Sequence, residues 1–223
     1  MQKTPSLIIR DLGLCDYTST LEAMQNFTLS RNEQTADELW LLEHPAVFTT
    51  GLTAKDHDLL NPGDIPVIKI DRGGQVTYHG PGQIILYTLI DLARNKLGVK
   101  ALVAKLEQSI IDLLAEYDIN AQRRDNAPGV YVDNQKIASL GLRVKKGRCY
   151  HGLSLNTNMN LEPFQRIIPC GLPDITVTQL RNFYNSVDIQ YVKQQLTRHV
   201  CQHLGYNLSS AVYENTLPDL KTS

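Results

Sequence analysis

The chain has 223 residues, 42% of them hydrophobic, and carries 22 Lys and Arg against 23 Asp and Glu. This length and apolar content predict one domain, residues 1–223, with a sizeable core, and the near-zero net charge gives no general attraction to nucleic acid or an anionic membrane. No run is long and apolar enough for a transmembrane helix, and the first residues lack the apolar core of a signal peptide. The four cysteines are scattered without a Cys-x-x-Cys pair, which favours a reducing compartment. We therefore expect a soluble, cytoplasmic protein.

The first part of the chain predicts strands around one helix. Residues 6–10 form a short apolar run typical of a strand, and apolar side chains at three- and four-residue spacings predict a helix over 18–30. The run 38–44 predicts a second strand, and 46–51 follows directly after a proline. Residues 52–64 are polar and predict a loop.

The second part predicts a long helix, a meander and a helical end. One apolar stripe predicts a helix over 101–117, and turn residues between apolar runs predict three antiparallel strands within 130–157. Two helices are expected near 177–182 and 188–204, followed by a loose tail of about a dozen residues. We predict an α/β fold of the α+β type, with a mixed or largely antiparallel sheet packed by helices.

Residues 71–83 are the most unusual stretch, because they contain four glycines and a proline between polar and aromatic side chains. Glycine and proline are poor in helix and strand interiors, so we expect a loop. The flanking runs 66–71 and 84–90 predict buried strands. A polar, glycine-rich loop held between two core strands is typical of a ligand cradle.

The motif Arg-Gly-Gly-x-x-Thr-Tyr-His-Gly-Pro-Gly-Gln at 72–83 resembles the signature of the octanoyltransferases of lipoate biosynthesis, the lipoate-protein ligase B family. A second stretch, Leu-Glu-His-Pro-x-Val-Phe-Thr-x-Gly at 42–51, also resembles that family, and the likeness extends over about 42–178. It implies a fold like the catalytic domain of biotin and lipoate ligases.

Cys170 lies between two prolines and beside a glycine, so its thiol is expected on a stiff loop. A helix starting just after Asp174 would favour the thiolate, although a free cysteine taken alone is more often an inert buried side chain. The resemblance implies that Cys170 accepts the acyl group as a thioester. It also implies that Lys136, in Lys-Ile-Ala-Ser-Leu-Gly, pairs with this cysteine.

The resemblance further implies substrate contacts in three segments, whose backbone amides are candidate donors to an oxyanion. These residues are Arg72, Gly73, Gly74, Gln75, Val76, Thr77, Tyr78 and His79 in the first segment, Ser139, Leu140 and Gly141 in the second, and Gly152, Leu153 and Ser154 in the third. For Tyr78 and His79 two roles stay open, either to orient the acyl carbonyl or incoming amine or merely to fix the loop.

The implied reaction moves octanoyl from octanoyl-acyl carrier protein to a lysine amine. The implied acceptors are the lipoyl domains of 2-oxoacid dehydrogenase complexes and the glycine cleavage H protein. Transfer from a thioester to an amine runs downhill, so we expect no ATP, cofactor or metal, and no phosphate-binding Gly-x-x-x-x-Gly-Lys-Ser/Thr loop is present. Arg143, Lys145, Lys146 and Arg148 form a basic cluster that would steer an acidic carrier protein or is simply solvated.

Three alternatives remain. An ATP-dependent lipoate or biotin-type ligase would need no nucleophilic cysteine, and a non-catalytic module binding acyl carrier or lipoyl domains would need neither Cys170 nor Lys136. A metal site built from Cys149, His151, Cys170 or His79 has the least support, because zinc ligands usually come as spaced pairs.

Overall fold

The computed structural model describes residues 7–125, 127–168 and 175–218, so Cys170 lies outside the described residues. Within these ranges seven strands form a mixed sheet in the order β10-β1-β2-β6-β9-β8-β7. Its strands are β1 (Leu7–Leu14), β2 (Asp37–Glu43), β6 (Gln83–Leu89), β7 (Val130–Val132), β8 (Gln135–Lys145), β9 (Arg148–Asn156) and β10 (Val212–Glu214). β1 pairs in parallel with β2 and β10, whereas the other neighbours are antiparallel.

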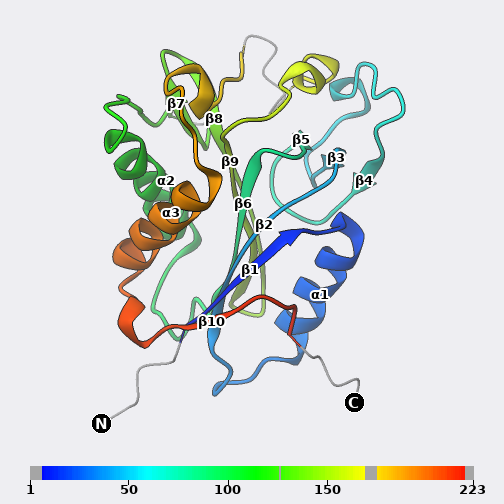
Figure 1. Ribbon diagram of the computed structural model, residues 1–223. Coiled ribbons are helices and arrows are strands. Elements are labelled where there is room, and N and C mark those ends of the chain that lie inside the picture. The colour runs from blue at the N-terminus through cyan, green and yellow to red at the C-terminus, as the bar shows by residue number, and fades with distance from the viewer. Residues whose placement is uncertain (1–6, 126, 169–174, 219–223) are drawn as a thin grey trace.

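Helices cover both faces of this sheet (Figure 1). They are α1 (Tyr17–Ser30), α2 (Val99–Ala115) and α3 (Ile189–Leu204). α2 and α3 pack together on one face, and α1 lies on the other. No helix in the described part of the chain has the length and apolar character needed to cross a bilayer.

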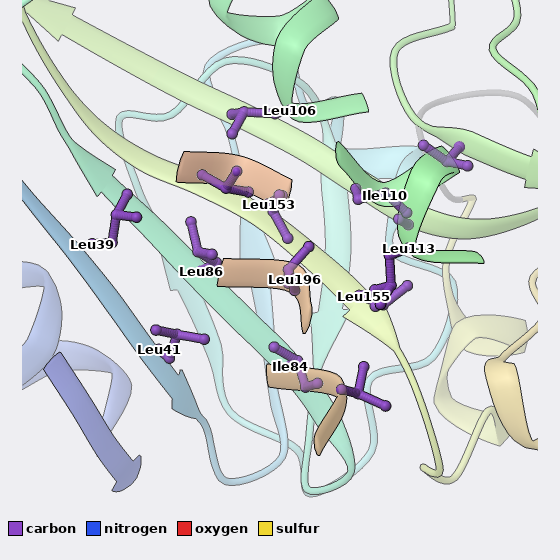
Figure 2. Close-up of a cluster of buried hydrophobic side chains, with 14 of the residues drawn as sticks. Leu39, Leu41, Ile84, Leu86, Leu106, Ile110, Leu113, Leu153, Leu155 and Leu196 are labelled. Atoms are coloured by element: carbon purple, nitrogen blue, oxygen red, sulfur yellow. The ribbon is translucent and has the colours of Figure 1, made fainter. Parts of the chain in front are cut away.

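The period-two alternation of the central strands assigns their side chains to the two layers. On β2, Leu39 and Leu41 join the core beneath α2 and α3, while Trp40 and Leu42 join the core beneath α1. Figure 2 shows the first of these cores, in which leucines of β2, β6 and β9 meet those of α2 and α3. Both faces of β6 are therefore buried, as its unbroken apolar sequence predicts.

A small second sheet lies beside the main one and carries the glycine-rich stretch. Its order is β4 (Val67–Lys69), β3 (Val47–Thr50) and β5 (Val76–His79), with β3 and β5 antiparallel. Two expectations are wrong here. Residues 76–79 of this stretch form strand β5 rather than loop, and β4 is an exposed edge strand rather than a buried one, because its only partner within the described residues is β3.

The C-terminal part also differs from the sequence prediction. Residues 175–179 are not helical, and 180–182 form a single 3-10 turn, because the backbone bonds of Thr176 and Thr178 go to Lys136 on β8. The expected helix after Asp174 therefore does not begin in the described residues that follow it. The tail is not loose throughout, because β10 pairs with β1 and the buried Arg10 side chain binds both Glu214 and the Thr216 carbonyl.

Candidate active site

The main sheet brings two of the predicted segments directly together. Across β8 and β9, Ser139 faces Ser154, Leu140 faces Leu153 and Gly141 faces Gly152. Glycine is required at the last pair, since a Cβ on Gly152 would lie 2.0 Å from the Leu86 carbonyl oxygen. The register of this hairpin therefore joins segments that are separate in the sequence.

The remaining predicted segment, residues 72–79, is bonded to the same hairpin. The Gly73 amide donates to the Leu142 carbonyl at 2.9 Å, so this amide is occupied and is not a ready oxyanion donor. The buried Arg72 guanidinium donates to the Thr49 carbonyl and hydroxyl at 3.0 and 2.8 Å. A Cβ on Gly141 would lie 2.9 Å from Arg72 Cδ, so this glycine lets the arginine stem pass.

These segments enclose a cavity of about 450 Å³, a size typical of small-molecule sites. All predicted substrate-binding residues line it except Tyr78. Lys136 lines it as well. The sequence did not assign the remaining lining residues to substrate binding; they are Tyr17, Thr53, Ile85, Tyr87, Val99, Val103, Ala127, Pro128, Leu142 and His151.

Tyr78 lies on the other side of β5 from its neighbours in the cavity wall. Its ring packs against Phe48 and Phe164, with centroids 5.5 Å away in each case, in a separate apolar cluster. Because adjacent strand residues point to opposite faces, Thr77 and His79 face the cavity and Tyr78 does not. Tyr78 therefore does not line the cavity, and its ring packs within the apolar cluster of the small sheet.

Lys136 is only 3% exposed, which the sequence did not predict for a lysine just after a turn. Its backbone amide donates to Thr176 and its carbonyl accepts from Thr178, so the segment that follows Cys170 in sequence pairs with this part of β8. Its ammonium lies 5.6 Å from the ring centroid of Tyr131. Nearby Gly129 has φ +144°, and a Cβ there would lie 2.5 Å from Lys136 Cε. The lysine is therefore tightly enclosed.

A cluster of rings forms one wall of the cavity. The His79 ring stacks on Tyr17 at 5.8 Å, and His44 lies behind them, 6.1 Å from His79. Burial lowers the pKa of His79 to about 3 and that of His44 to about 4. Burial also raises the pKa of Tyr17 to about 12. All three side chains are therefore neutral near pH 7.

His151 lines the cavity, whereas the sequence suggested it only as one ligand of a weakly supported metal site. Its backbone φ of +60° is rare for any residue other than glycine. The His151 ring lies beside that of Tyr150, with the two ring centroids 5.0 Å apart. Both side chains bind Asp71, the residue before Arg72. The hydrogen bond from His151 and then that from Tyr150 lower the pKa of Asp71 to about 2, despite its partial burial. The Tyr-His-Gly sequence at 150–152 repeats that at 78–80, and this repeat is a sequence feature that could have indicated His151 as a second cavity histidine.

The predicted basic cluster is smaller than its sequence indicates. The Arg143 and Arg148 guanidinium groups lie 3.9 Å from the carboxylates of Asp71 and Asp91, which offset their charges. Lys145 and Lys146 remain exposed on the turn between β8 and β9. Among the described residues, no group of three or more His, Cys, Asp and Glu side chains is placed to hold a metal ion.

Comparison with known proteins extends the likeness beyond 42–178. The model of the lipoyl protein ligase A/B catalytic domain family matches residues 16–201. An octanoyltransferase of Stutzerimonas stutzeri is 52% identical over 198 residues, covering 89% of this chain and 90% of that relative. One of Nitrosococcus oceani is 53% identical over 212 residues, covering 95% of each chain.

Solved structures confirm the expected fold. A bipartite lipoate protein ligase of Thermoplasma acidophilum matches with a TM-score of 0.73 at 14% identity, covering 96% of this chain and 89% of that one. Biotin protein ligase of Aquifex aeolicus matches with a TM-score of 0.56 at 15% identity, covering 91% and 71%. The family match, the close sequence relatives and the shared fold agree: this chain belongs to the lipoyl protein ligase A/B catalytic domain family, and its near relatives are octanoyltransferases.

Proposed function

We propose that this protein is a cytoplasmic octanoyltransferase of protein lipoylation, acting as one catalytic domain. It moves octanoyl from octanoyl-acyl carrier protein to a lysine amine of a lipoyl domain, including those of 2-oxoacid dehydrogenase complexes and the glycine cleavage H protein. One observation carries the proposal. The segments expected to bind substrate converge on a cavity that is walled by apolar side chains and contains the buried Lys136.

The proposed reaction has two steps. The Cys170 thiolate attacks the carbonyl carbon of the octanoyl thioester, a new C–S bond forms and the C–S bond to the carrier breaks. The carrier leaves as a thiol by taking up the proton that the Cys170 thiol released. A lysine amine then attacks the enzyme thioester. The N–C bond forms, the C–S bond breaks, and one amine proton passes to the cysteine sulfur.

The chain's residues have separate roles in these steps. The Lys136 ammonium stabilises the Cys170 thiolate, because only a few per cent of an ordinary thiol is ionised near neutral pH. Ile85, Val103 and Leu153 are among the apolar side chains in the wall that receives the acyl chain. Arg72 fixes the glycine-rich segment by binding Thr49 and passing over Gly141.

Intact-mass analysis after mixing the protein with octanoyl-loaded acyl carrier protein, without ATP, tests this proposal. We expect an octanoyl adduct that hydroxylamine removes and that Cys170→Ser lacks, while Cys201→Ser, which replaces a buried cysteine on α3, still forms it. No adduct on the wild-type protein would contradict the thioester route. Modification of a lipoyl domain from free octanoate only with ATP would then indicate a ligase, and no modification would indicate a binding module.

Charge reversal at the exposed turn tests carrier steering. The double substitution Lys145→Glu and Lys146→Glu should raise the apparent KM for octanoyl-acyl carrier protein about 3- to 30-fold at low salt, because it repels an acidic partner. It should spare a small octanoyl thioester. Lys69→Glu, at an exposed lysine on β4, is the matched control. Equal loss with both acyl donors would rule out steering by this turn.

A further inference from the structure

A buried hydrogen-bond relay connects the cavity wall to the backbone of the Lys136 strand. His79 Nδ1 lies 2.7 Å from Gln83 Oε1, and Gln83 Nε2 donates to Asn156 Oδ1 at 2.8 Å. Asn156 Nδ2 donates to the Thr178 carbonyl at 2.9 Å. The Thr178 amide then donates to the Lys136 carbonyl at 3.0 Å. The relay thus joins two residues of the same cavity through β6, β9 and the segment at 175–178.

Two backbone carbonyls determine which atom donates and which accepts in each side-chain hydrogen bond of this relay. The Gln83 amide nitrogen also faces the Tyr78 carbonyl at 3.2 Å, and the Asn156 amide nitrogen faces that of Thr178. A carbonyl only accepts, so neither amide can be reversed. Gln83 Oε1 must therefore accept its bond from His79. His79 carries its proton on Nδ1, and its Nε2 is a hydrogen-bond acceptor.

Packing of the sheet does not require polar side chains at positions 83 and 156. Gln83 and Asn156 are paired where β6 begins and β9 ends, are 1% and 4% exposed, and adjoin the apolar pair Ile84 and Leu155. Replacing both partners of a buried hydrogen bond by apolar groups of similar shape is often nearly neutral for stability. A fully bonded polar pair at this place therefore indicates that the orientation of His79 matters.

The neutral His79 ring restricts the group that it can bind in the cavity. Stabilising an oxyanion requires hydrogen-bond donors, and His79 Nε2 in this tautomer is an acceptor. The ligand group must therefore bring its own N–H or O–H. No carboxylate of the described residues lines the cavity, whereas the cations Arg72 and Lys136 do, and nearby cations favour a neutral amine over an ammonium.

We infer that Gln83 and Asn156 are positioning residues that hold His79 Nε2 as an acceptor for one N–H of the attacking lysine amine. The inference rests on the proposed function and assigns His79 to the second step. The amine keeps its lone pair for the carbonyl carbon while one N–H is held by the imidazole. The bond strengthens as the nitrogen becomes positive, and the other proton of that nitrogen then passes to the leaving cysteine sulfur. His79 orients the nucleophile without taking the proton itself.

Single-turnover discharge of the octanoyl-enzyme tests this role. Protein preloaded from octanoyl-acyl carrier protein is mixed either with a purified lipoyl domain or with 2-mercaptoethanol, whose attacking thiolate has no N–H. We expect His79→Phe, which retains a ring against Tyr17, to slow discharge to the lipoyl domain about 10- to 100-fold, as loss of one buried hydrogen bond implies. Loading and discharge to the thiol should stay within about threefold of wild type. His57→Phe, at a histidine whose side chain is 69% exposed, is the matched control.

Gln83→Met supplies a second variant that leaves His79 in place. It removes the partner of Nδ1, so discharge to the amine should slow while thiol discharge does not. Imidazole ¹⁵N shifts of the wild-type protein should show a proton on Nδ1 alone, and His79 in Gln83→Met should show a mixture of tautomers.

The outcomes are distinct. Equal slowing with amine and thiol, or slowing of the loading step alone, would overturn the inference, as would a proton on His79 Nε2 in the wild-type protein. Absence of any octanoyl-enzyme in the wild-type protein would instead overturn the proposed function.

Discussion

Replacing Lys136 by methionine is expected to slow formation of the octanoyl-enzyme by about 10²- to 10⁴-fold, the usual contribution of a positioned proton-transfer or charge-stabilising group. Methionine retains an unbranched, flexible side chain in the enclosed space beside Gly129 and removes only the ammonium. The variant should keep its fold, because the backbone bonds of Lys136 to Thr176 and Thr178 do not depend on the side chain.

Two measurements check this expectation. Single-turnover intact-mass analysis gives the rate of adduct formation, and iodoacetamide labelling with peptide mapping gives the alkylation rate of each cysteine. Near neutral pH, Cys170 should be alkylated faster than Cys15, Cys149 and Cys201, and this difference should shrink in Lys136→Met.

A matched control exists on α3. Lys193 is also 3% exposed, but its ammonium binds Asp11 at 3.1 Å outside the cavity. Lys193→Met should leave both rates within about twofold of wild type, as expected for a lysine without a role in the site. Undiminished alkylation of Cys170 in Lys136→Met would show that the ammonium does not activate the thiol.

The protein is expected to lose about 4 kcal/mol of unfolding free energy between neutral pH and about pH 5, because His44 and His79 are buried in their neutral forms. Their pKa values in the folded protein are about 4 and about 3, against 6.5 for an ordinary histidine. Above pH 6.5 both states of the protein hold these rings neutral, so the stability is fully present. As the pH falls below 6.5, the unfolded chain takes up protons that the folded chain does not.

Carboxyl groups whose pKa is lowered in the folded protein lose their stabilising contribution only at lower pH, and Asp71 and Glu116 are two examples. The pKa of Asp71 is lowered from 3.8 to about 2, so its stabilising contribution disappears below pH 3.8. The window above pH 5 therefore reports on histidines. The Glu116 pKa is likewise lowered from 4.5, which places its contribution below that window as well.

Urea unfolding monitored by the fluorescence of buried Trp40, at half-unit steps of pH, measures the effect. His44→Phe should reduce the slope of unfolding free energy against pH by up to about 1.4 kcal/mol per pH unit. It will also lower stability at every pH, because the Cys15 carbonyl and the Tyr87 hydroxyl lose their partner. A slope equal to that of wild type would show that His44 is not buried in the neutral form.

Periodicity in the sequence predicted most of the regular elements. The apolar stripe found α2, the alternation and turn pairs found β7, β8 and β9, and the unbroken apolar run found β6. These patterns work because each reflects how one element buries its own faces. They failed for β4, β10 and residues 175–179, whose conformation depends on a partner strand that lies elsewhere in the chain.

The sequence by itself determined the family resemblance, the helices α1, α2 and α3, and the residue types able to carry acyl transfer, because these depend on local spacing and composition. Only the tertiary structure decided that Ser139–Gly141 and Gly152–Ser154 face each other, that Tyr78 turns away from the cavity and that Lys136 is buried. It also decided the direction of the bonds through Gln83 and Asn156 to His79. The reason is physical: register, burial and hydrogen-bond polarity arise between segments far apart in the chain, and no local pattern encodes which partner a residue will meet.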